Sequence, residues 1–89
     1  MPTRTVTIAS SVGLHARPAA LLASAVNDSG LDVTVALSGG DPVDAGSILE
    51  VMTLGAAHGD IVTLAAEGDG ADAVLDSLVE LLSRDLDNE

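Results

Sequence analysis

One short stretch, Gly13-Leu14-His15-Ala16-Arg17-Pro18, combines a histidine, an arginine and a proline at the start of an apolar helical pattern. The first backbone N–H groups of a helix have no acceptor inside it and carry partial positive charge, so anions are stabilised there. Proline suits the first helical turn because its ring fixes φ and its missing N–H costs nothing there. We therefore interpret the stretch as a phosphoryl-accepting site, with His15 at the N-cap position as the nucleophile.

The neighbours of His15 each have a predicted role. The backbone N–H groups of Ala16 and Arg17 would point past the ring, and the Arg17 guanidinium would neutralise the transferred group. Gly13 would allow the preceding turn the φ that presents the ring. A positive helix end and a guanidinium both oppose protonation of an imidazole, whose ordinary pKa is about 6.5. We therefore predict a neutral, nucleophilic imidazole at pH 7.

A second motif, Ser47-Ile48-Leu49-Glu50, fits the S-x-x-E capping box. In this box the serine accepts a hydrogen bond from a first-turn N–H, and the glutamate reaches back to the serine's own N–H. We expect Ser47 to open a short helix that stops at Gly55.

Apolar residues cover too much of this short helix for all of them to be buried against one sheet. Val51 and Leu54 are three residues apart and are predicted to point inward together. This leaves an exposed patch of apolar side chains, and such patches often mark partner surfaces. We call Ile48, Leu49 and Met52 the α-helical patch.

Other chemically active residues support weaker interpretations. His58 lies in a predicted turn and receives no chemical role, and no second histidine or cysteine stands at ligand spacing, so no metal site is expected. Asp76-Ser77-Leu78 is similar to the serine motif of acyl carrier proteins, which carries phosphopantetheine. That motif should open a helix of an all-helical bundle, whereas here it falls inside the last predicted helix of a chain with several strands.

Strands are predicted where apolar and polar residues alternate. The clearest run is 31–37; residues 3–9 form another, and a fourth strand follows the turn at 57–60 with Val62, Leu64 and Ala66 on its inner face. A short strand through Val43 could pair back as a hairpin, and Pro42 limits it to an edge.

Helices are predicted where apolar residues follow a 3.6-residue period. One covers residues 16–27, and another covers 71–85 with a buried stripe of Val74, Leu75, Leu78, Leu81 and Leu82. The resulting order β-α-β-β-α-β-α indicates a single α+β domain over residues 1–89. We expect an antiparallel four-stranded sheet with helices on one face.

The composition limits the classes of partner. The chain has a formal net charge of −11, and its only basic residues are Arg4, Arg17 and Arg84. This charge argues against binding to nucleic acid or anionic membranes and favours partners with a basic docking face. Lack of cysteine is compatible with a cytoplasmic location. The apolar run 18–26 is not interpreted as part of a signal peptide, and no membrane insertion is expected.

The motif G-L-H-A-R-P-A at Gly13, together with V-D-A-G-S-I-L-E-V-M-T-L-G-A-A-H-G-D at Val43, resembles HPr. HPr is the histidine-containing phosphocarrier of the bacterial phosphoenolpyruvate:sugar phosphotransferase system. The resemblance implies strand order 1-4-2-3 and a phosphoryl group carried on Nδ1 of His15. It also implies that the protein is no enzyme and uses no cofactor. It would take the group from phosphorylated enzyme I and pass it to enzyme II A-domains for sugar uptake.

The resemblance also implies how partners would bind. The α-helical patch and the region around His15 would dock enzyme I, the A-domains and transcriptional regulators, with the carrier acting as a monomer. In some relatives a dedicated kinase phosphorylates the serine at position 47. Here Gly46 replaces a frequent lysine and Glu50 adds negative charge, so capping is the default role of Ser47. A regulatory interaction module, of the nitrogen-type branch or a docking regulator, and an acyl carrier acting through Ser77 are the alternatives.

Overall fold

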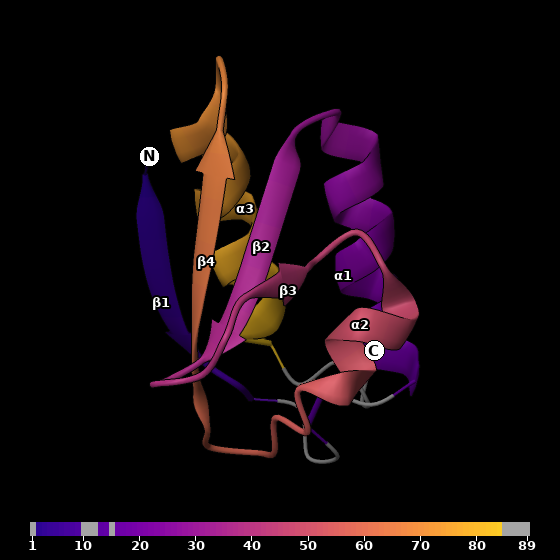
Figure 1. The fold of residues 1–89 in the computed structure, drawn as a ribbon. Coiled ribbons are helices and arrows are strands. Elements are labelled where there is room, and N and C mark those ends of the chain that lie inside the picture. The colour runs from indigo at the N-terminus through magenta and orange to yellow at the C-terminus, as the bar shows by residue number, and fades with distance from the viewer. Residues whose placement is uncertain (1, 10–12, 15, 85–89) are drawn as a thin grey trace.

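The computed structural model describes residues 2–9, 13–14 and 16–84. The predicted order of elements is confirmed in these residues (Figure 1). The elements are β1 (Thr3–Thr7), α1 (Ala16–Ser29), β2 (Asp32–Leu37), β3 (Val43–Asp44), α2 (Ile48–Thr53), β4 (Ile61–Glu67) and α3 (Ala71–Leu82).

The strands form one antiparallel sheet in the order β1-β4-β2-β3, as predicted. Val6 pairs with Val62 across β1 and β4, and Val35 pairs with Leu64 across β2 and β4. The two-residue strand β3 follows Pro42 at one edge, which confirms that proline limits it to an edge position.

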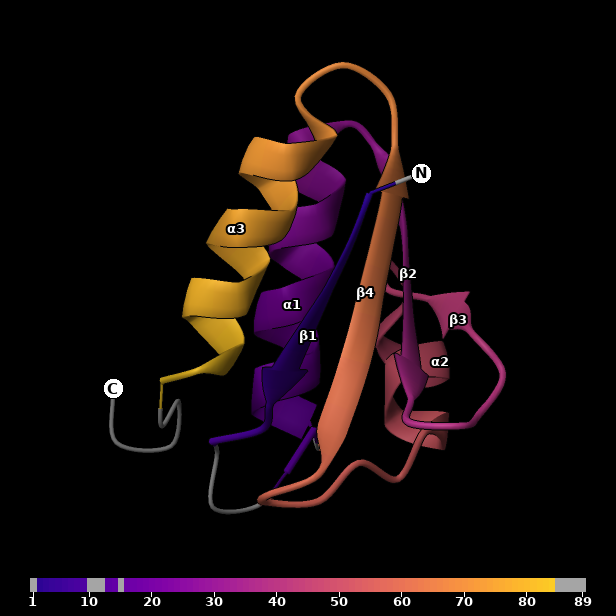
Figure 2. The same cartoon turned by 90° about the vertical axis from the view of Figure 1, so that its left-hand side faces the viewer.

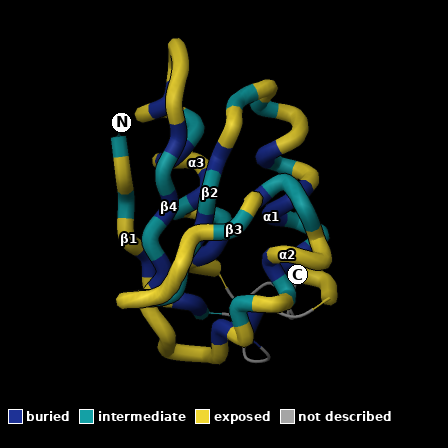
Figure 3. The backbone as a smooth tube through the Cα atoms, in the orientation of Figure 1, coloured by how far each residue is buried: buried dark blue, intermediate teal, exposed yellow. Residues whose placement is uncertain are grey.

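The helices α1 and α3 lie side by side over one face of the sheet, and α2 packs against α1 and β3 (Figure 2). Inward-facing residues of the strands alternate with more exposed ones, so buried and accessible segments alternate along β2 and β4 (Figure 3). The buried side chains of the described residues are aliphatic, with Pro18 among them, and the chain has no aromatic residue. Ala19, at 0 % exposure, lets α1 approach the sheet closely.

The apolar stripe of α3 is narrower than predicted. Leu75, Leu78 and Leu82 are buried, but Val74 and Leu81 are only partly buried. Both line a shallow groove between α3 and α1, together with Ala25. The buried leucines at the centre of the stripe face the sheet. Val74 and Leu81 at its edge face α1, which covers them only in part. The helix ends at Leu82; the predicted end at Asp85 lies outside the described residues.

An ion-pair cluster that the sequence analysis did not predict joins β1 to α3. Arg4 Nη2 lies 3.0 Å from Asp72 Oδ1 and Arg4 Nε lies 3.1 Å from Asp76 Oδ1. The hydrogen bonds to Asp72 and then Asp76 raise the pKa of the Arg4 guanidinium. Asp72 and Asp76 are one helical turn apart, so a single arginine reaches both.

Replacing Leu64, which is fully buried at the centre of the sheet, tests the importance of this core. We expect Leu64→Ala to lower the free energy of unfolding by about 2–5 kcal/mol, through lost burial and a cavity. The matched variant Leu49→Ala removes the same atoms from a side chain that is 77 % exposed, and should change stability by about 0.5 kcal/mol or less. Urea unfolding measures both, and equal losses would contradict the assignment of the core.

Candidate functional site

Several segments that are distant in sequence meet at the end of the molecule where α1 begins, the lower end in Figure 1. The N–H of Leu14 donates a hydrogen bond to the carbonyl of Ala56 over 2.9 Å, just after α2. The N–H of Ala9 donates to the carbonyl of Leu82 over 3.3 Å, at the end of α3. Both contacts tie the chain that precedes position 15 to the rest of the fold.

The turn between α2 and β4 is held against the same end. Ile8 and the turn exchange two hydrogen bonds: the N–H of Ile8 donates to the Asp60 carbonyl and the N–H of Gly59 donates to the Ile8 carbonyl, both over 2.9 Å. The Asp60 carboxylate accepts a further hydrogen bond from the N–H of Ala57 over 2.9 Å. These bonds fix the turn, and His58 lies exposed within it.

Gly13 has the conformation that its predicted role requires. Its φ is +72°, in the left-handed region that favours glycine, and the residue is buried. A Cβ added to Gly13 would lie 2.2 Å from the Ala56 carbonyl oxygen and 2.8 Å from the Ala57 Cα. Glycine is therefore required here for two reasons, the backbone angle and the close approach of the connection after α2.

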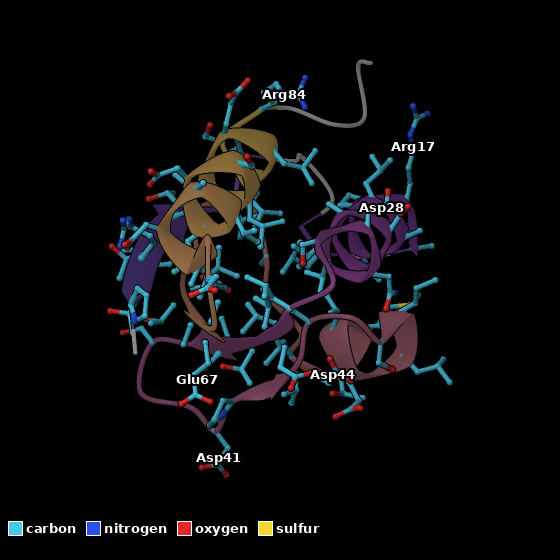
Figure 4. All side chains as sticks on the ribbon, turned by 90° about the horizontal axis from the view of Figure 1, so that it is seen from above. Arg17, Asp28, Asp41, Asp44, Glu67 and Arg84 are labelled. Carbon is cyan, nitrogen blue, oxygen red and sulfur yellow. The ribbon has the colours of Figure 1, made fainter. Side chains whose placement is uncertain are left out.

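The helix α1 begins at Ala16, so the predicted start of the helix is confirmed. Ala16 and Arg17 are exposed, whereas Pro18 in the first turn is buried. The side chain of Arg17 extends away from the sheet, on the outer side of the helix layer (Figure 4). His15, the predicted nucleophile and N-cap residue, lies outside the described residues.

These features give the start of α1 a definite chemical capacity. The first N–H groups of a helix and its positive pole favour an anion, and an exposed guanidinium adds a charge of fixed sign. Ala16 and Arg17 are both exposed, so an anion beside them would remain accessible to solvent.

The capping box at α2 is formed only in part. Ser47 Oγ accepts a hydrogen bond from the N–H of Glu50 over 3.4 Å, as predicted. The prediction that the Glu50 carboxylate accepts a hydrogen bond from the Ser47 N–H is wrong. This N–H donates instead to the Asp44 carbonyl over 3.1 Å. Glu50 Oε1 accepts from the N–H of Asp44 over 3.4 Å. The turn from Asp44 to Ser47 satisfies the serine N–H first and leaves the glutamate to bond one turn further back.

A side chain of α1 links it to the start of α2. Asn27 Nδ2 donates to the carbonyl of Ala23 over 2.9 Å and to the carbonyl of Gly46 over 3.1 Å. Asn27 and Gly46 are distant in sequence, so the helical periodicity of the sequence could not predict this hydrogen bond. The residues of α2 therefore run from this contact towards the hydrogen bond between Leu14 and Ala56.

The α-helical patch is less uniform than predicted. Leu49 is 77 % and Ile48 is 44 % exposed, and Val51 is fully buried, all as expected. Met52 and Leu54 are both partly buried and pack against the core. The prediction that Met52 points outward and Leu54 inward is thus only partly right. Met52 and the C-cap residue Leu54 lie one and three residues from the buried Val51, so both occupy the flanks of its inward face.

The fold and this helix start together define a class of protein: a small open-faced sandwich of a sheet and helices with an exposed helix start at one end. The chain matches the PTS-HPr family, described as the PTS HPr component phosphorylation site, over residues 2–84. It therefore belongs to the HPr family, the phosphocarrier proteins of the phosphotransferase system, which are not enzymes.

Similar proteins support this assignment. The chain is 40 % identical to phosphocarrier protein HPr of Streptomyces coelicolor over 87 residues, which cover 98 % of this chain and 94 % of that one. It is 44 % identical to phosphocarrier protein HPr of Haloferax volcanii, covering 90 % of this chain and 91 % of the relative. The crystal structure of HPr from Thermoanaerobacter tengcongensis aligns with a TM-score of 0.85 at 36 % identity, over 92 % of this chain and 91 % of that chain.

The fold also decides against the acyl carrier alternative. Ser77 lies within α3 and is exposed, and the chain contains a four-stranded sheet rather than an all-helical bundle.

Among the described residues, no helix is long and apolar enough to cross a membrane.

The variant Gly13→Ala tests the close approach at the site. We expect it to lower the free energy of unfolding by more than the roughly 1–2 kcal/mol that a left-handed conformation costs an alanine. The control is Gly39→Ala in the β2–β3 turn, where φ is +79° and nothing lies within 4 Å of an added Cβ. Urea unfolding of both variants separates backbone strain from the clash, and an equal loss in both would contradict the role of the Ala56 contact.

Proposed function

We propose that His15 accepts the phosphoryl group that this HPr-family carrier transfers. The observation that supports this most strongly is the arrangement of the described residues on either side of it. Gly13 and Leu14 are locked to Ala56, and α1 then begins at Ala16 with Arg17 exposed. Position 15 directly precedes this helix start in the sequence, and a helix start favours an anion.

The transfer reaction exchanges one P–N bond for another. The Nδ1 lone pair of His15, with the ring proton on Nε2, attacks the phosphorus of a phosphohistidine on enzyme I. The P–N bond of the donor breaks, and its electron pair returns to the donor nitrogen, so no water and no redox change is involved. Passage of the group to an enzyme II A-domain repeats this step in the other direction. The phosphoryl group on enzyme I comes originally from phosphoenolpyruvate.

The backbone N–H groups of Ala16 and Arg17, with the Arg17 guanidinium, would stabilise the phosphoryl charge. A carrier must bind the group only moderately, because stabilising the phosphorylated state strongly would slow onward transfer. An open helix end with one arginine meets this requirement better than an enclosed cage of cations.

The partners would bind across the start of α1 and the α-helical patch. Leu49 and Ile48 are exposed on α2, which packs against α1. Apolar side chains of this kind supply the centre of an interface, while the acidic surface around them suits a basic docking face. Enzyme I and the enzyme II A-domains would use this surface in turn, in the cytoplasm.

Repulsion between copies that each carry a charge of −11 supports a monomeric carrier. A solution molar mass of twice 8.8 kDa would contradict this state.

For Ser47 we propose a structural role rather than regulation. Its Oγ already caps α2, and the chain around it carries the carboxylates of Asp44 and Glu50, which also bond within this turn. A phosphate on Ser47 would displace the cap and repel both carboxylates. An acid-stable phosphoryl group on Ser47 after incubation with ATP and a serine kinase would contradict this assignment.

Intact mass after incubation with phosphoenolpyruvate, magnesium and enzyme I tests the acceptor. We expect one added phosphoryl group that is lost in acid and kept in base, because a phosphohistidine P–N bond is acid-labile. His15→Ala should abolish it.

The matched control is His58→Gln, which alters the only other histidine and should leave the adduct unchanged. An adduct that survives in His15→Ala and disappears in His58→Gln would move the acceptor to the turn after α2. Absence of any adduct, with an enzyme I that is active on another carrier, would instead favour a docking regulator without turnover.

The variant Leu49→Gln tests the α-helical patch. Truncating or polarising a central interface side chain commonly costs more than 1 kcal/mol of binding, so we expect KM for phosphoryl transfer from enzyme I to rise about tenfold with little change in kcat. Ile61→Gln serves as the control, because Ile61 is 49 % exposed on the open face of the sheet. Equal effects of the two variants would contradict a specific role of α2.

A further inference from the structure

The three arginines of this acidic chain are placed unevenly. Arg4 is paired with Asp72 and Asp76 between β1 and α3. Arg17 and Arg84 project from the outer side of the helix layer, where Asp28 of α1 also lies, whereas Asp41, Asp44 and Glu67 lie towards the sheet (Figure 4). Arg17 stands in the first turn of α1 and Arg84 follows the last turn of α3.

The two helices run in opposite directions, so the start of α1 and the end of α3 lie at the same end of the molecule (Figure 2). This arrangement places the positive pole of α1 beside the negative pole of α3. The hydrogen bond from Ala9 to the Leu82 carbonyl holds the end of α3 next to the chain that leads towards position 15. A phosphoryl dianion at the start of α1 would therefore be repelled by the carbonyl end of α3.

Arg84 is placed to offset this repulsion. It directly follows the C-cap residue Ser83, and its N–H donates to the Leu81 carbonyl over 3.3 Å, so its backbone continues the last turn. A cation at this position reduces the negative potential of the helix end. The other charged residues of α3 are Glu80, one turn earlier, and Asp72 and Asp76, which pair with Arg4 of β1. From α1, Asp28 lines the same groove between the helices as Arg84.

We infer that Arg84 is an electrostatic positioning residue for phosphoryl transfer. Together with Arg17 it makes the helix-side end of a strongly acidic carrier less repulsive to the phosphoryl-bearing site of a donor. The rest of the surface would repel that dianion. Arg84 would thus favour the productive orientation of the encounter without being the residue that holds the transferred group. This inference depends on the proposed acceptor site at the start of α1.

A purely structural role predicts a different result. If Arg84 only stabilised the end of α3, its removal would lower the unfolding midpoint and leave transfer by the folded protein unchanged. An electrostatic role in transfer predicts a salt-dependent change in rate at constant fold, since steering between exposed charges is screened over a Debye length of about 10 Å at 0.1 M ionic strength.

The experiment compares initial rates of phosphoryl transfer from phosphorylated enzyme I to the full chain at low and high salt. We expect Arg84→Gln to lower kcat/KM about 3- to 10-fold at low salt, mainly through KM, with the difference shrinking as salt is added. Arg84→Lys keeps the charge and should retain most of the rate. Arg17→Gln is the reference for loss of direct phosphoryl stabilisation and should lower kcat as well.

The matched control is Arg4→Gln, which makes the same change in net charge on the far side of α3 and should alter kcat/KM less than about twofold. Urea unfolding of every variant verifies that the assay follows folded protein. Equal rates for Arg84→Gln and Arg4→Gln would overturn the inference, as would a loss that high salt does not relieve. Failure of the wild-type chain to accept a phosphoryl group would instead overturn the proposed acceptor site, so the two failures are distinguishable.

Discussion

The contact between Gly13–Leu14 and Ala56 is the constraint on which the functional end of this protein depends. A backbone hydrogen bond of 2.9 Å and a glycine at φ +72° bring the chain before α1 against the chain after α2. No side chain at position 13 fits between them. The contact therefore fixes the start of α1 relative to the end of α2, and with it the relation between the anion-stabilising helix end and the exposed side chains of α2. Asn27 makes the corresponding link at the other end of α2.

The sequence was most informative for strands in which apolar and polar residues alternate and only one face is buried. Alternation in β4 identified Val62, Leu64 and Ala66 as inward-facing, and all three are buried. The position of Pro42 before an edge strand and of Ser47 before α2 followed from local backbone chemistry. Gly13 was identified from its place before a helix start, although the close approach of Ala56 that makes it necessary involves a residue far along the chain. The strand order came from the family resemblance, because no local pattern determines which strands are neighbours.

The errors arose where packing between helices or competition among polar groups decided the outcome. Val74 and Leu81 fit a helical stripe, but whether they are covered depends on how closely α1 approaches α3. Met52 and Leu54 share their exposure because a six-residue helix lies in the angle between α1 and β3. Glu50 bonds Asp44 rather than Ser47 because a tight turn supplies another acceptor for the serine N–H. The pairing of Arg4 with Asp72 and Asp76 joins the two ends of the chain and has no local signature.

A carrier protein has requirements that oppose those of an enzyme. It must make a phosphoryl group stable enough to survive between partners, and reactive enough to leave for the next one. An open helix start supplies stabilisation through backbone dipoles that cannot reorganise, while exposure to solvent limits its strength. The antiparallel neighbour α3 limits it further, since its negative pole lies at the same end. The relative placement of these two poles is set by the antiparallel packing of α1 and α3. In the proposed function, the positive pole of α1 would offer a dianion local stabilisation on a chain with a net charge of −11.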